Sequence, residues 1–412
     1  MKSPHSALPS ILARFVVRDD CLQIGGLPLS QLAVRVGQTP FYAYDRRLLD
    51  QRIAELRGCL PVAVKLHYAV KANPMPAVVD YLAERVDGLD VASQGELRIA
   101  LDSGMAVERI SFAGPAKRPW ELQAAIAAGV LLHVESSHEL ETIGRLAEAQ
   151  GIRARVAVRV NPDFELKTSG MRMGGGPKPF GMDAEQVPAM LRRIAVLDLD
   201  FQGFHVFAGS QNLKAEAIVE AHAKTLELLL NLAEQAPAPS RHFNIGGGFG
   251  IPYFPGDQPL DLEPIAAHLN AWLPRVRARQ PQAELILELG RYLVGEAGIY
   301  VVEVVDRKVS RGHVFLITNG GMHHHLAASG NFGQVIRKNY PLLVGNRVSG
   351  GDREVVSVVG PLCTPLDVLG DRVELARADI GDLIVVLQSG AYGMSASPGR
   401  FLSHPPALEV LV

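Results

Sequence analysis

Eight short apolar segments recur between residues 66 and 289, and an amphipathic stretch follows most of them. The segments are rich in β-branched and aromatic residues and show no regular alternation of polar and apolar side chains. A strand of this kind is buried on both faces, which is typical of parallel sheets. The eight segments are residues 66–70, 88–92, 110–113, 131–134, 155–160, 201–206, 242–245 and 284–289.

The stretches between these segments have the periodicity and the caps of helices. Ser93 stands as a cap before one of them, and Glu96 follows three residues later, as in a capping box. The expected helices are residues 76–85, 94–103, 119–128, 137–149, 183–194, 215–235 and 262–279. Eight strands with intervening helices predict an α/β fold with a TIM (β/α)8 barrel over roughly residues 40–300. An open doubly wound sheet is the alternative.

The pattern changes after Gly298, where strand-like segments are no longer separated by long helices. Residues 299–309, 313–318, 354–359, 382–387 and 407–412 predict a C-terminal, mainly antiparallel β domain. Residues 19–36 are expected to add an N-terminal strand, on the pattern of residues 22–24 and 32–36. The expected organisation is an N-terminal segment over 1–40 that packs with the β domain, a barrel over 41–298 and the β domain over 299–412.

Composition excludes several classes of protein. The chain of 412 residues carries 41 basic and 43 acidic side chains, so no basic excess points to nucleic acid or to an anionic membrane. Residues 285–305 form the most apolar run, but four charged residues interrupt it, which argues against a membrane span. The N-terminus shows no signal-peptide pattern. Three distant cysteines suit a reducing compartment, and we expect a cytoplasmic protein.

Polar residues follow the ends of the predicted barrel strands, where barrel enzymes carry their active sites. Lys71 comes directly after an apolar strand. Partial burial lowers the pKa of a lysine amine and suits Schiff-base chemistry, although a lysine at this place can also simply reach solvent. Glu288 stands at the end of the eighth strand, where it can pair with a protonated pyridine nitrogen or with Arg291. His205 can stack on a flat ring or belong to the core.

Residues 244–250 read Asn-Ile-Gly-Gly-Gly-Phe-Gly directly after the seventh strand. Backbone N–H groups of such a loop can surround a phosphate, and this position in a barrel is a recurrent phosphate site. The same glycines also suit an ordinary turn. An amine nucleophile, a phosphate cradle, a carboxylate and a stacking histidine together predict a site for pyridoxal 5′-phosphate.

The sequence resembles the fold-type III pyridoxal phosphate decarboxylases, which include diaminopimelate, ornithine and arginine decarboxylases. The resemblance covers nearly the whole chain and implies a barrel with a β domain, as in alanine racemase and ornithine decarboxylase. Its motifs are residues 67–73, 89–97, 203–211, 246–250, 288–291, 360–363 and 389–393. Residues 288–291 read Glu-Leu-Gly-Arg, with Leu289 where the family has proline.

The resemblance implies a role for each matching residue. Lys71 would hold the cofactor covalently, His205 would stack on its ring, and Glu288 would pair with its protonated nitrogen. Asp90 and Arg159 would shape the site near the ring. The residues expected to bind the phosphate or to lie around the cofactor are Ser210, Gly247, Gly248, Gly290, Arg291 and Tyr392. Members of the family are head-to-tail homodimers, so Cys363 would come from the second subunit and protonate the carbanion after carbon dioxide leaves.

Departures from the family pattern concern the substrate. Diaminopimelate decarboxylases carry a Glu that recognises the distal amino acid centre, and Thr364 stands at that position here. The arginine that binds the distal carboxylate is replaced by residues 321–330, which include the triplet His323–His325. Adjacent side chains alternate along a strand, so we expect no metal at the triplet. The predicted substrate-binding residues are Arg291, His323, Thr364, Asp367 and Tyr392.

A narrower resemblance links residues 161–167, 171–178, 323–338 and 401–405 to the decarboxylases associated with exosortase A systems. Related enzymes act on larger or tethered substrates. We therefore expect α-decarboxylation of a diamino acid, or of a conjugated or carrier-linked amino acid, with no nucleic-acid or membrane partner. The alternatives are a true meso-diaminopimelate decarboxylase, an amino acid racemase and a non-catalytic regulator. Glu288 argues against a racemase, because racemases usually place arginine there, and the retained Lys71 argues against the regulator.

Overall fold

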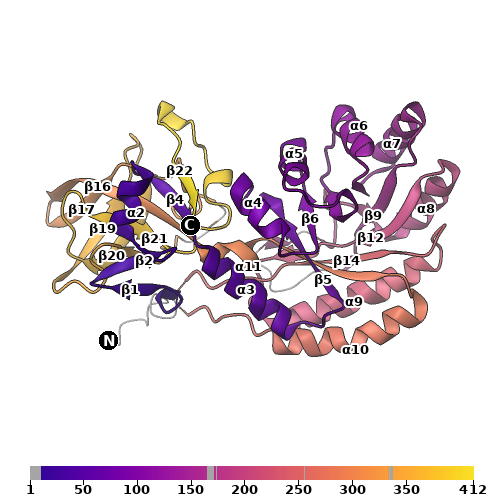
Figure 1. Ribbon diagram of the computed structural model, residues 1–412, viewed down its shortest axis with the longest axis horizontal. Helices are drawn as coiled ribbons and strands as arrows, with labels where there is room; N and C mark the ends of the chain where they lie inside the picture. The colour runs from indigo at the N-terminus through magenta and orange to yellow at the C-terminus, as the bar shows by residue number, and fades with distance from the viewer. Residues whose placement is uncertain (1–10, 165–170, 173, 255, 333, 335–336) are drawn as a thin grey trace. The chain divides into compact units, whose positions relative to one another are not determined.

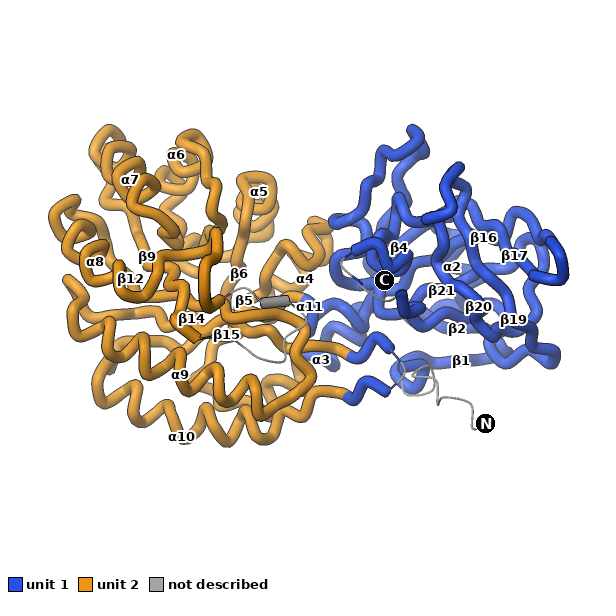
Figure 2. The backbone as a smooth tube through the Cα atoms, turned by 180° about the vertical axis from the view of Figure 1, so that it is seen from behind, with its two compact units in different colours: residues 1–52, 252–258, 291–412 blue, residues 53–251, 259–290 orange. Residues whose placement is uncertain are grey.

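The computed structural model describes residues 11–164, 171–172, 174–254, 256–332, 334 and 337–412. Parts of the segments 161–167, 171–178 and 323–338 thus lie outside the described residues. Contacts divide the chain into two compact units, which Figure 2 distinguishes by colour. Unit 1 comprises residues 1–52, 252–258 and 291–412, and unit 2 comprises residues 53–251 and 259–290.

Unit 2 is a closed barrel of eight parallel strands. Neighbouring strands pair in the order β9-β12-β14-β15-β5-β6-β7-β8, and β8 pairs with β9 to close the ring. This closure confirms the predicted barrel and excludes the open sheet. The strands are β5 (Val64–Ala69), β6 (Gly88–Val91), β7 (Ile110–Phe112), β8 (Leu131–Val134), β9 (Arg155–Asn161), β12 (Asp200–His205), β14 (His242–Gly247) and β15 (Glu284–Leu289).

Helices lie around the outside of these strands (Figure 1). They are α4 (Pro76–Ala83), α5 (Gln94–Asp102), α6 (Pro119–Ala128), α7 (Ser137–Gln150), α8 (Val187–Val196), α9 (Ala215–Ala233) and α10 (Glu263–Arg279). The Ser93 hydroxyl accepts a hydrogen bond from the backbone N–H of Glu96 at 3.2 Å, so the predicted cap of α5 is present. Helix α3 (Arg46–Cys59), which precedes the barrel, was not predicted.

The strands of the barrel are buried on both faces, as their composition predicts. Tyr68, Phe112, Phe204 and Phe243 are fully buried, and such aromatic side chains contribute much of the apolar area that stabilises a core. Gly203 has φ +144°, and a Cβ atom there would collide with the backbone carbonyl oxygen of His242. The absence of a side chain therefore permits the close approach of β12 to β14.

Unit 1 is a mainly antiparallel β structure, as predicted. Its larger sheet has the order β18-β21-β16-β17-β19-β20, with β4 paired to β16 and β22, and a smaller sheet contains β1, β2 and β3. The strands are β1 (Val16–Arg18), β2 (Cys21–Ile24), β3 (Leu27–Pro28), β4 (Phe41–Tyr44), β16 (Gly298–Ser310), β17 (His313–Thr318), β18 (Leu342–Val344), β19 (Arg353–Val359), β20 (Val368–Ala376), β21 (Leu383–Val386) and β22 (Leu408–Leu411). The pairs β17–β19 and β22–β4 are parallel.

One expected strand is a helix. Residues 32–36 belong to α2 (Leu29–Val36), although the expected strand at residues 22–24 is present as part of β2. Leu29 and Leu32 are buried and stand three residues apart, which is the spacing of one helix face. Gly37 ends the helix in a left-handed conformation. The strands β1, β3, β4, β18 and β20 of unit 1 were not predicted.

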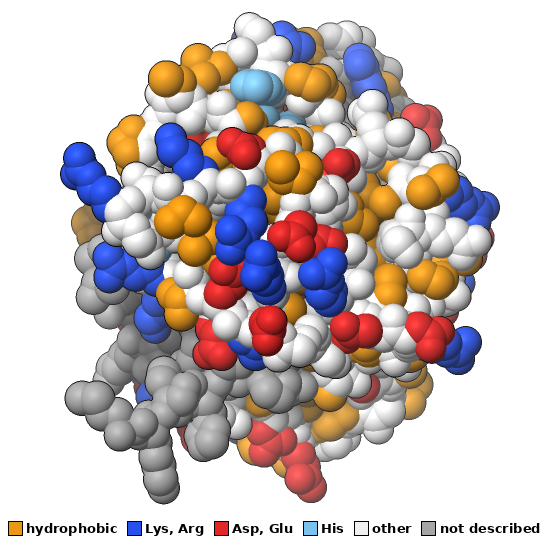
Figure 3. Space-filling view, turned by 90° about the vertical axis from the view of Figure 1, so that its left-hand side faces the viewer, with side chains coloured by type: hydrophobic (Ala, Val, Ile, Leu, Met, Phe, Trp, Pro, Cys, Tyr) orange, Lys and Arg blue, Asp and Glu red, His pale blue; other side chains and the backbone are white. Residues whose placement is uncertain are grey.

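Charged side chains of both signs are mixed on the face seen in Figure 3. In unit 1, Arg307 pairs with Glu354 at 2.7 Å and Arg353 with Glu374 at 3.3 Å. Partly exposed ion pairs of this kind contribute little to stability, and mixed charges form no strong field of one sign. Within the described ranges of the chain, no helix combines the length and apolarity that crossing a membrane requires.

Candidate active site

Lys71 lies at the carboxyl end of the first barrel strand. Strand β5 ends at Ala69, and the 3-10 turn η1 (Val70–Ala72) places Lys71 at the mouth of the barrel. The Tyr68 hydroxyl donates to the carbonyl oxygen of Asn73 at 2.8 Å and so fixes this turn. The Lys71 side chain is 40% exposed, and its Nζ lies 3.5 Å from Oε1 of Glu288. The amine is therefore both accessible and directed toward a carboxylate.

Glu288 lies near the end of β15 with its side chain buried. Its Oε2 lies 3.0 Å from Nε2 of His205, which ends β12. Burial alone raises the pKa of Glu288, but the Lys71 amine and the His205 imidazole more than reverse this effect and hold the pKa well below its usual range. The carboxylate is thus ionised over the whole working pH range. The structure brings Lys71, His205 and Glu288 together at the mouth of the barrel.

A second histidine, which the sequence analysis did not single out, lies behind His205. The rings of His133 and His205 are 4.4 Å apart at 35°, and both side chains are buried. Burial, together with the electrostatic effect of the neighbouring His205, lowers the pKa of His133 well below 6.5. His133 is therefore neutral and supports one face of His205 by ring packing. Its only sequence signal is a polar residue in an otherwise apolar strand.

The glycine loop that follows β14 lies against the loop that follows β12. Gly246 and Gly248 have φ angles of +71° and +79°, and a Cβ atom at Gly248 would collide with the carbonyl oxygen of Gly209. The N–H of Asn212 donates to the carbonyl oxygen of Gly248 at 2.9 Å. Ser210, in the short strand β13 (Gly209–Ser210), pairs with β10 (Met171–Arg172). Two loops of small residues thus present backbone groups at one place, which is the arrangement that binds phosphate.

The chemistry of the side chains and loops at the barrel mouth fits pyridoxal phosphate. An accessible amine suits the cofactor's carbonyl carbon, and an ionised buried carboxylate suits a protonated ring nitrogen. Gly247 also lacks room for a side chain, because a Cβ atom would collide with the backbone of Glu288. A Cβ atom at Gly290 would lie 2.9 Å from that of Ala72, next to Lys71. Small residues therefore keep the turn of Lys71 close to the strand of Glu288.

Asp90 and Arg159 are buried in separate polar clusters of the barrel. Asp90 accepts a hydrogen bond from Ser111, and its Oδ2 lies 3.4 Å from Nδ1 of His67. Arg159 donates from Nη1 to Oε1 of Glu135 at 2.8 Å.

Arg291 and Tyr392 lie together in unit 1. The guanidinium of Arg291, at the start of α11 (Arg291–Val294), lies 4.7 Å from the centre of the Tyr392 ring. Arg291 also donates from Nη1 to the hydroxyl of Tyr253 at 2.7 Å. Tyr253 was not predicted as a site residue. Its position three residues after the glycine loop is the sequence feature that could have indicated it.

Cys363 and Thr364 belong to a loop of unit 1 that Asp367 organises. The Cys363 thiol is exposed. The Asp367 carboxylate accepts hydrogen bonds from the N–H groups of Met322 at 2.6 Å and Leu362 at 2.8 Å. These two bonds tie the loop of Cys363 to the turn that begins the histidine triplet. The roles of Cys363, Thr364 and Asp367 toward a substrate stay predictions.

Comparison with known proteins decides the family. Residues 46–295 match the model of the pyridoxal-binding domain of pyridoxal-dependent decarboxylases, which is more than half of the chain. The chain belongs to the pyridoxal-dependent decarboxylase family. The decarboxylase is 40% identical to the L-glutamyl-[BtrI acyl-carrier protein] decarboxylase of Niallia circulans, over 91% of this chain and 89% of that protein.

Two further relatives extend the comparison. The decarboxylase is 30% identical to the 2-[(L-alanin-3-ylcarbamoyl)methyl]-2-hydroxybutanedioate decarboxylase of Staphylococcus aureus, over 92% of this chain and 95% of that one. Its fold matches the crystal structure of diaminopimelate decarboxylase from M. jannaschii with a TM-score of 0.85 and 27% identity, over 98% and 93% of the two chains. These matches confirm the predicted family, the fold and the class of enzyme, a pyridoxal-dependent amino acid decarboxylase.

The histidine triplet of the decarboxylase lies in a turn after β17 and is buried. His324 approaches Tyr300 and the carbonyl oxygen of Pro405, at 3.1 and 2.8 Å. The His323 ring is 3.7 Å from that of His324, and burial lowers the pKa of His323 to about 3. No metal-binding group of three or more His, Cys, Asp or Glu occurs in the described part of the chain. Substrate binding by His323 stays a prediction.

We expect His325 to make the decarboxylase sensitive to acid. Its Nδ1 accepts from the N–H of Ala328 at 3.2 Å, so protonation would break this bond, and burial lowers its pKa to about 3. Since an unfolded histidine has a pKa of about 6.5, the unfolded state binds the proton first, and stability is lost as the pH falls below that value. The loss through this one group is about 2 kcal/mol at pH 5. Urea unfolding at pH 7.5 and 5 measures it.

Two variants isolate this contribution. In His325→Gln the free energy of unfolding is expected to be lower at pH 7.5, but its fall between pH 7.5 and 5 should be smaller than in the wild type. His138→Gln, at an exposed histidine, provides the control and should retain the wild-type fall. An equal pH dependence in His325→Gln and the wild type would contradict the assignment.

Proposed function

We propose that the chain uses pyridoxal 5′-phosphate to α-decarboxylate an amino acid whose side chain is conjugated or carrier-linked, releasing carbon dioxide and an amine. The observation that carries the proposal is the cluster at the barrel mouth, where the accessible Lys71 amine lies 3.5 Å from the buried, ionised Glu288 and His205 lies 3.0 Å from the same carboxylate. An amine nucleophile beside a fixed negative charge is what the chemistry of this cofactor requires of a protein.

When bound, the cofactor supplies an electron sink for the bond that breaks at Cα. Lys71 would hold it, Glu288 would keep its ring nitrogen protonated, and His205 would lie on its ring. Asp90 and Arg159 would lie near the ring. The residues that we propose to bind the phosphate or to lie around the cofactor are Ser210, Gly247, Gly248, Gly290, Arg291 and Tyr392.

The reaction itself requires few groups of the protein. Cleavage of the bond from Cα to the carboxylate releases carbon dioxide and leaves an electron pair on Cα. A proton must then reach Cα, and we assign its delivery to Cys363 of the partner subunit in a head-to-tail homodimer. The exposed position of the Cys363 thiol supports this assignment. The free cysteines support a reducing, cytoplasmic location.

Two findings support a conjugated substrate. Two of the relatives are named for substrates in which an amino acid is joined to a larger group, one of them to a carrier protein. Thr364 also places a neutral, half-buried side chain where diaminopimelate decarboxylases carry a carboxylate. A neutral group there leaves a distal ammonium without its ion pair, which favours a substrate with an uncharged linkage. Thr364, His323 and Asp367 are the proposed contacts, together with Arg291 and Tyr392.

Carbon dioxide release from two substrates tests the proposal. We expect L-glutamate joined through its side-chain carboxyl to pantetheine to react with a kcat/KM at least about 100-fold above that of meso-diaminopimelate, which corresponds to about 3 kcal/mol of discrimination. A higher kcat/KM for meso-diaminopimelate would identify a lysine-forming enzyme instead. Chiral analysis of recovered substrate addresses the remaining class, because inversion at Cα without carbon dioxide release would indicate a racemase.

A further inference from the structure

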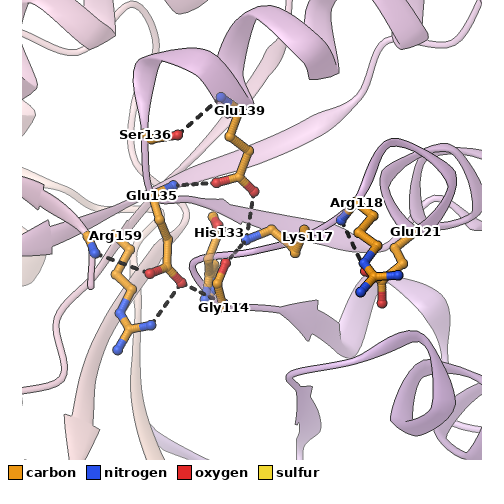
Figure 4. A network of polar contacts seen from close by, with 10 residues as sticks. Gly114, Lys117, Arg118, Glu121, His133, Glu135, Ser136, Glu139 and Arg159 are labelled. Carbon is orange, nitrogen blue, oxygen red and sulfur yellow. Dashed lines mark hydrogen bonds and ion pairs between the residues drawn. The ribbon is translucent and has the colours of Figure 1, made fainter. Parts of the chain in front are cut away.

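Four charged side chains are buried together at the barrel mouth, beside the site described above (Figure 4). Lys117 follows β7, Glu135 follows β8, Glu139 lies in the first turn of α7, and Arg159 lies near the end of β9. Their side chains are between 1% and 8% exposed. Two positive and two negative charges make the cluster neutral, but each ion still loses most of its hydration.

Glu135 connects three segments at the carboxyl ends of the strands. Its Oε1 accepts from Nη1 of Arg159 at 2.8 Å and from the N–H of Gly114 at 2.5 Å. Its Oε2 accepts from the N–H of Gly181 at 3.1 Å. The Arg159 guanidinium also lies 5.2 Å from the centre of the Phe180 ring. The carboxylate therefore fixes both the direction of Arg159 and the loop that precedes β11 (Met182–Asp183).

Lys117 and Glu139 support this arrangement from the other side. The Lys117 Nζ lies 2.6 Å from Oε1 of Glu139 and donates to the carbonyl oxygens of Gly114 and His133, at 2.6 and 2.9 Å. Glu139 Oε2 accepts from the N–H of Glu135 at 2.9 Å. This pair binds backbone atoms and has no hydrogen bond with Arg159 among the described residues. The Lys117–Glu139 pair therefore holds backbone segments only, whereas Glu135 also holds the side chain of Arg159.

The cluster is continuous with the candidate active site through His133. Lys117 binds the backbone of His133, the His133 ring packs on His205, and His205 lies 3.0 Å from Glu288. Charges on Arg159 and Lys117 also act on the His133 ring. Arg159 therefore belongs to the same mouth of the barrel as Lys71, and only Nη1 of its guanidinium donates to an acceptor within the described residues. Its other N–H groups remain for a ligand.

Stability alone explains this cluster poorly. Buried ion pairs lose so much hydration that apolar side chains of similar volume often stabilise a fold equally well. A carboxylate that fixes a guanidinium in one orientation can help to bind an anion, because preorganised donors stabilise negative charge more strongly than mobile ones. Partners that orient a directly binding group commonly affect function about 10- to 100-fold.

We propose that Glu135 is a positioning residue that holds the Arg159 guanidinium toward an anionic oxygen of the bound cofactor or substrate. The proposal rests on the proposed function, because it needs a cofactor at Lys71. Glu135 itself does not touch the reacting atoms. It acts by fixing where the free N–H groups of Arg159 point.

Cofactor binding and turnover of four variants test this role. We expect Glu135→Gln to weaken cofactor binding about 10-fold, to shift the absorbance maximum of the bound cofactor and to lower kcat about 10- to 100-fold. Arg159→Lys should give the same spectral shift, and the double variant should be little worse than Arg159→Lys alone, because both changes remove one interaction. Glu139→Gln is the matched control. It should lower the melting temperature but leave the absorbance maximum in place.

Different results would contradict the positioning role of Glu135 and the proposed function. An unshifted absorbance maximum in Glu135→Gln, or equal spectral changes in Glu135→Gln and Glu139→Gln, would overturn the positioning role. If circular dichroism shows that Glu135→Gln does not fold, Glu135→Asp replaces it, and it should show the same shift because its shorter side chain withdraws from Arg159. A wild-type protein that binds no pyridoxal phosphate would overturn the proposed function itself.

Discussion

Replacing Lys71 by alanine is expected to lower carbon dioxide release at least about 1,000-fold, because the covalent attachment point of the cofactor is lost. Lys117, another lysine at the barrel mouth, offers no substitute, because its Nζ is engaged by Glu139 and two carbonyl oxygens. The variant should also lack the visible absorbance of a lysine-bound cofactor. Stopped assays of carbon dioxide and an absorbance spectrum of the cofactor-loaded protein measure both effects.

Lys65→Ala is the control for the Lys71 prediction. Lys65 lies in β5, the strand that leads to Lys71, six residues earlier in the sequence. Its register partner in β15 is Ile286, not Glu288. The variant should retain the wild-type spectrum and a kcat within about threefold of the wild type. Full turnover in Lys71→Ala would show that the barrel mouth uses another nucleophile and would refute the mechanism.

The sequence predicts the barrel well because its strands are buried on both faces. Such segments read as continuous apolar runs, and all eight predicted segments overlap a barrel strand. The prediction fails where burial is one-sided. Residues 32–36 read as a strand, but Leu29 and Leu32 form one face of a helix, and only the partner surface decides between these readings. Strand β4 was missed because residues 41–44 were assigned to the start of the barrel.

The central site was predictable because the strand order of a barrel brings distant strand ends together. Lys71, His205 and Glu288 each end or follow a predicted strand, so their meeting follows from the fold. The supporting charges were not predictable in the same way. Lys117 and Glu139 lie outside the strands, where charged residues usually face solvent, and only the folded structure shows that both are buried.

Replacing Glu288 by glutamine is expected to lower kcat about 100- to 1,000-fold, which corresponds to about 3 to 4 kcal/mol of transition-state stabilisation. An uncharged amide cannot keep a ring nitrogen protonated, so the electron sink weakens. Because Lys71 and His205 hold the pKa of Glu288 well below its usual range, the carboxylate stays ionised down to acid pH. Protonation of Glu288 should therefore not limit the wild-type rate between pH 5 and 9, and Glu288→Gln should be slow at every pH in this range.

A control on the same strand separates this electronic role from the stability of β15. Glu284 begins β15, and its carboxylate binds Arg109 at 2.6 Å, four residues from Glu288. Glu284→Gln removes a charge from the same strand, so it should lower the melting temperature while kcat stays near the wild-type value. Glu288→Asp retains the charge and should recover part of the rate that Glu288→Gln loses. If Glu288→Gln and Glu284→Gln lowered kcat equally, the charge of Glu288 would act on the fold rather than on the reaction.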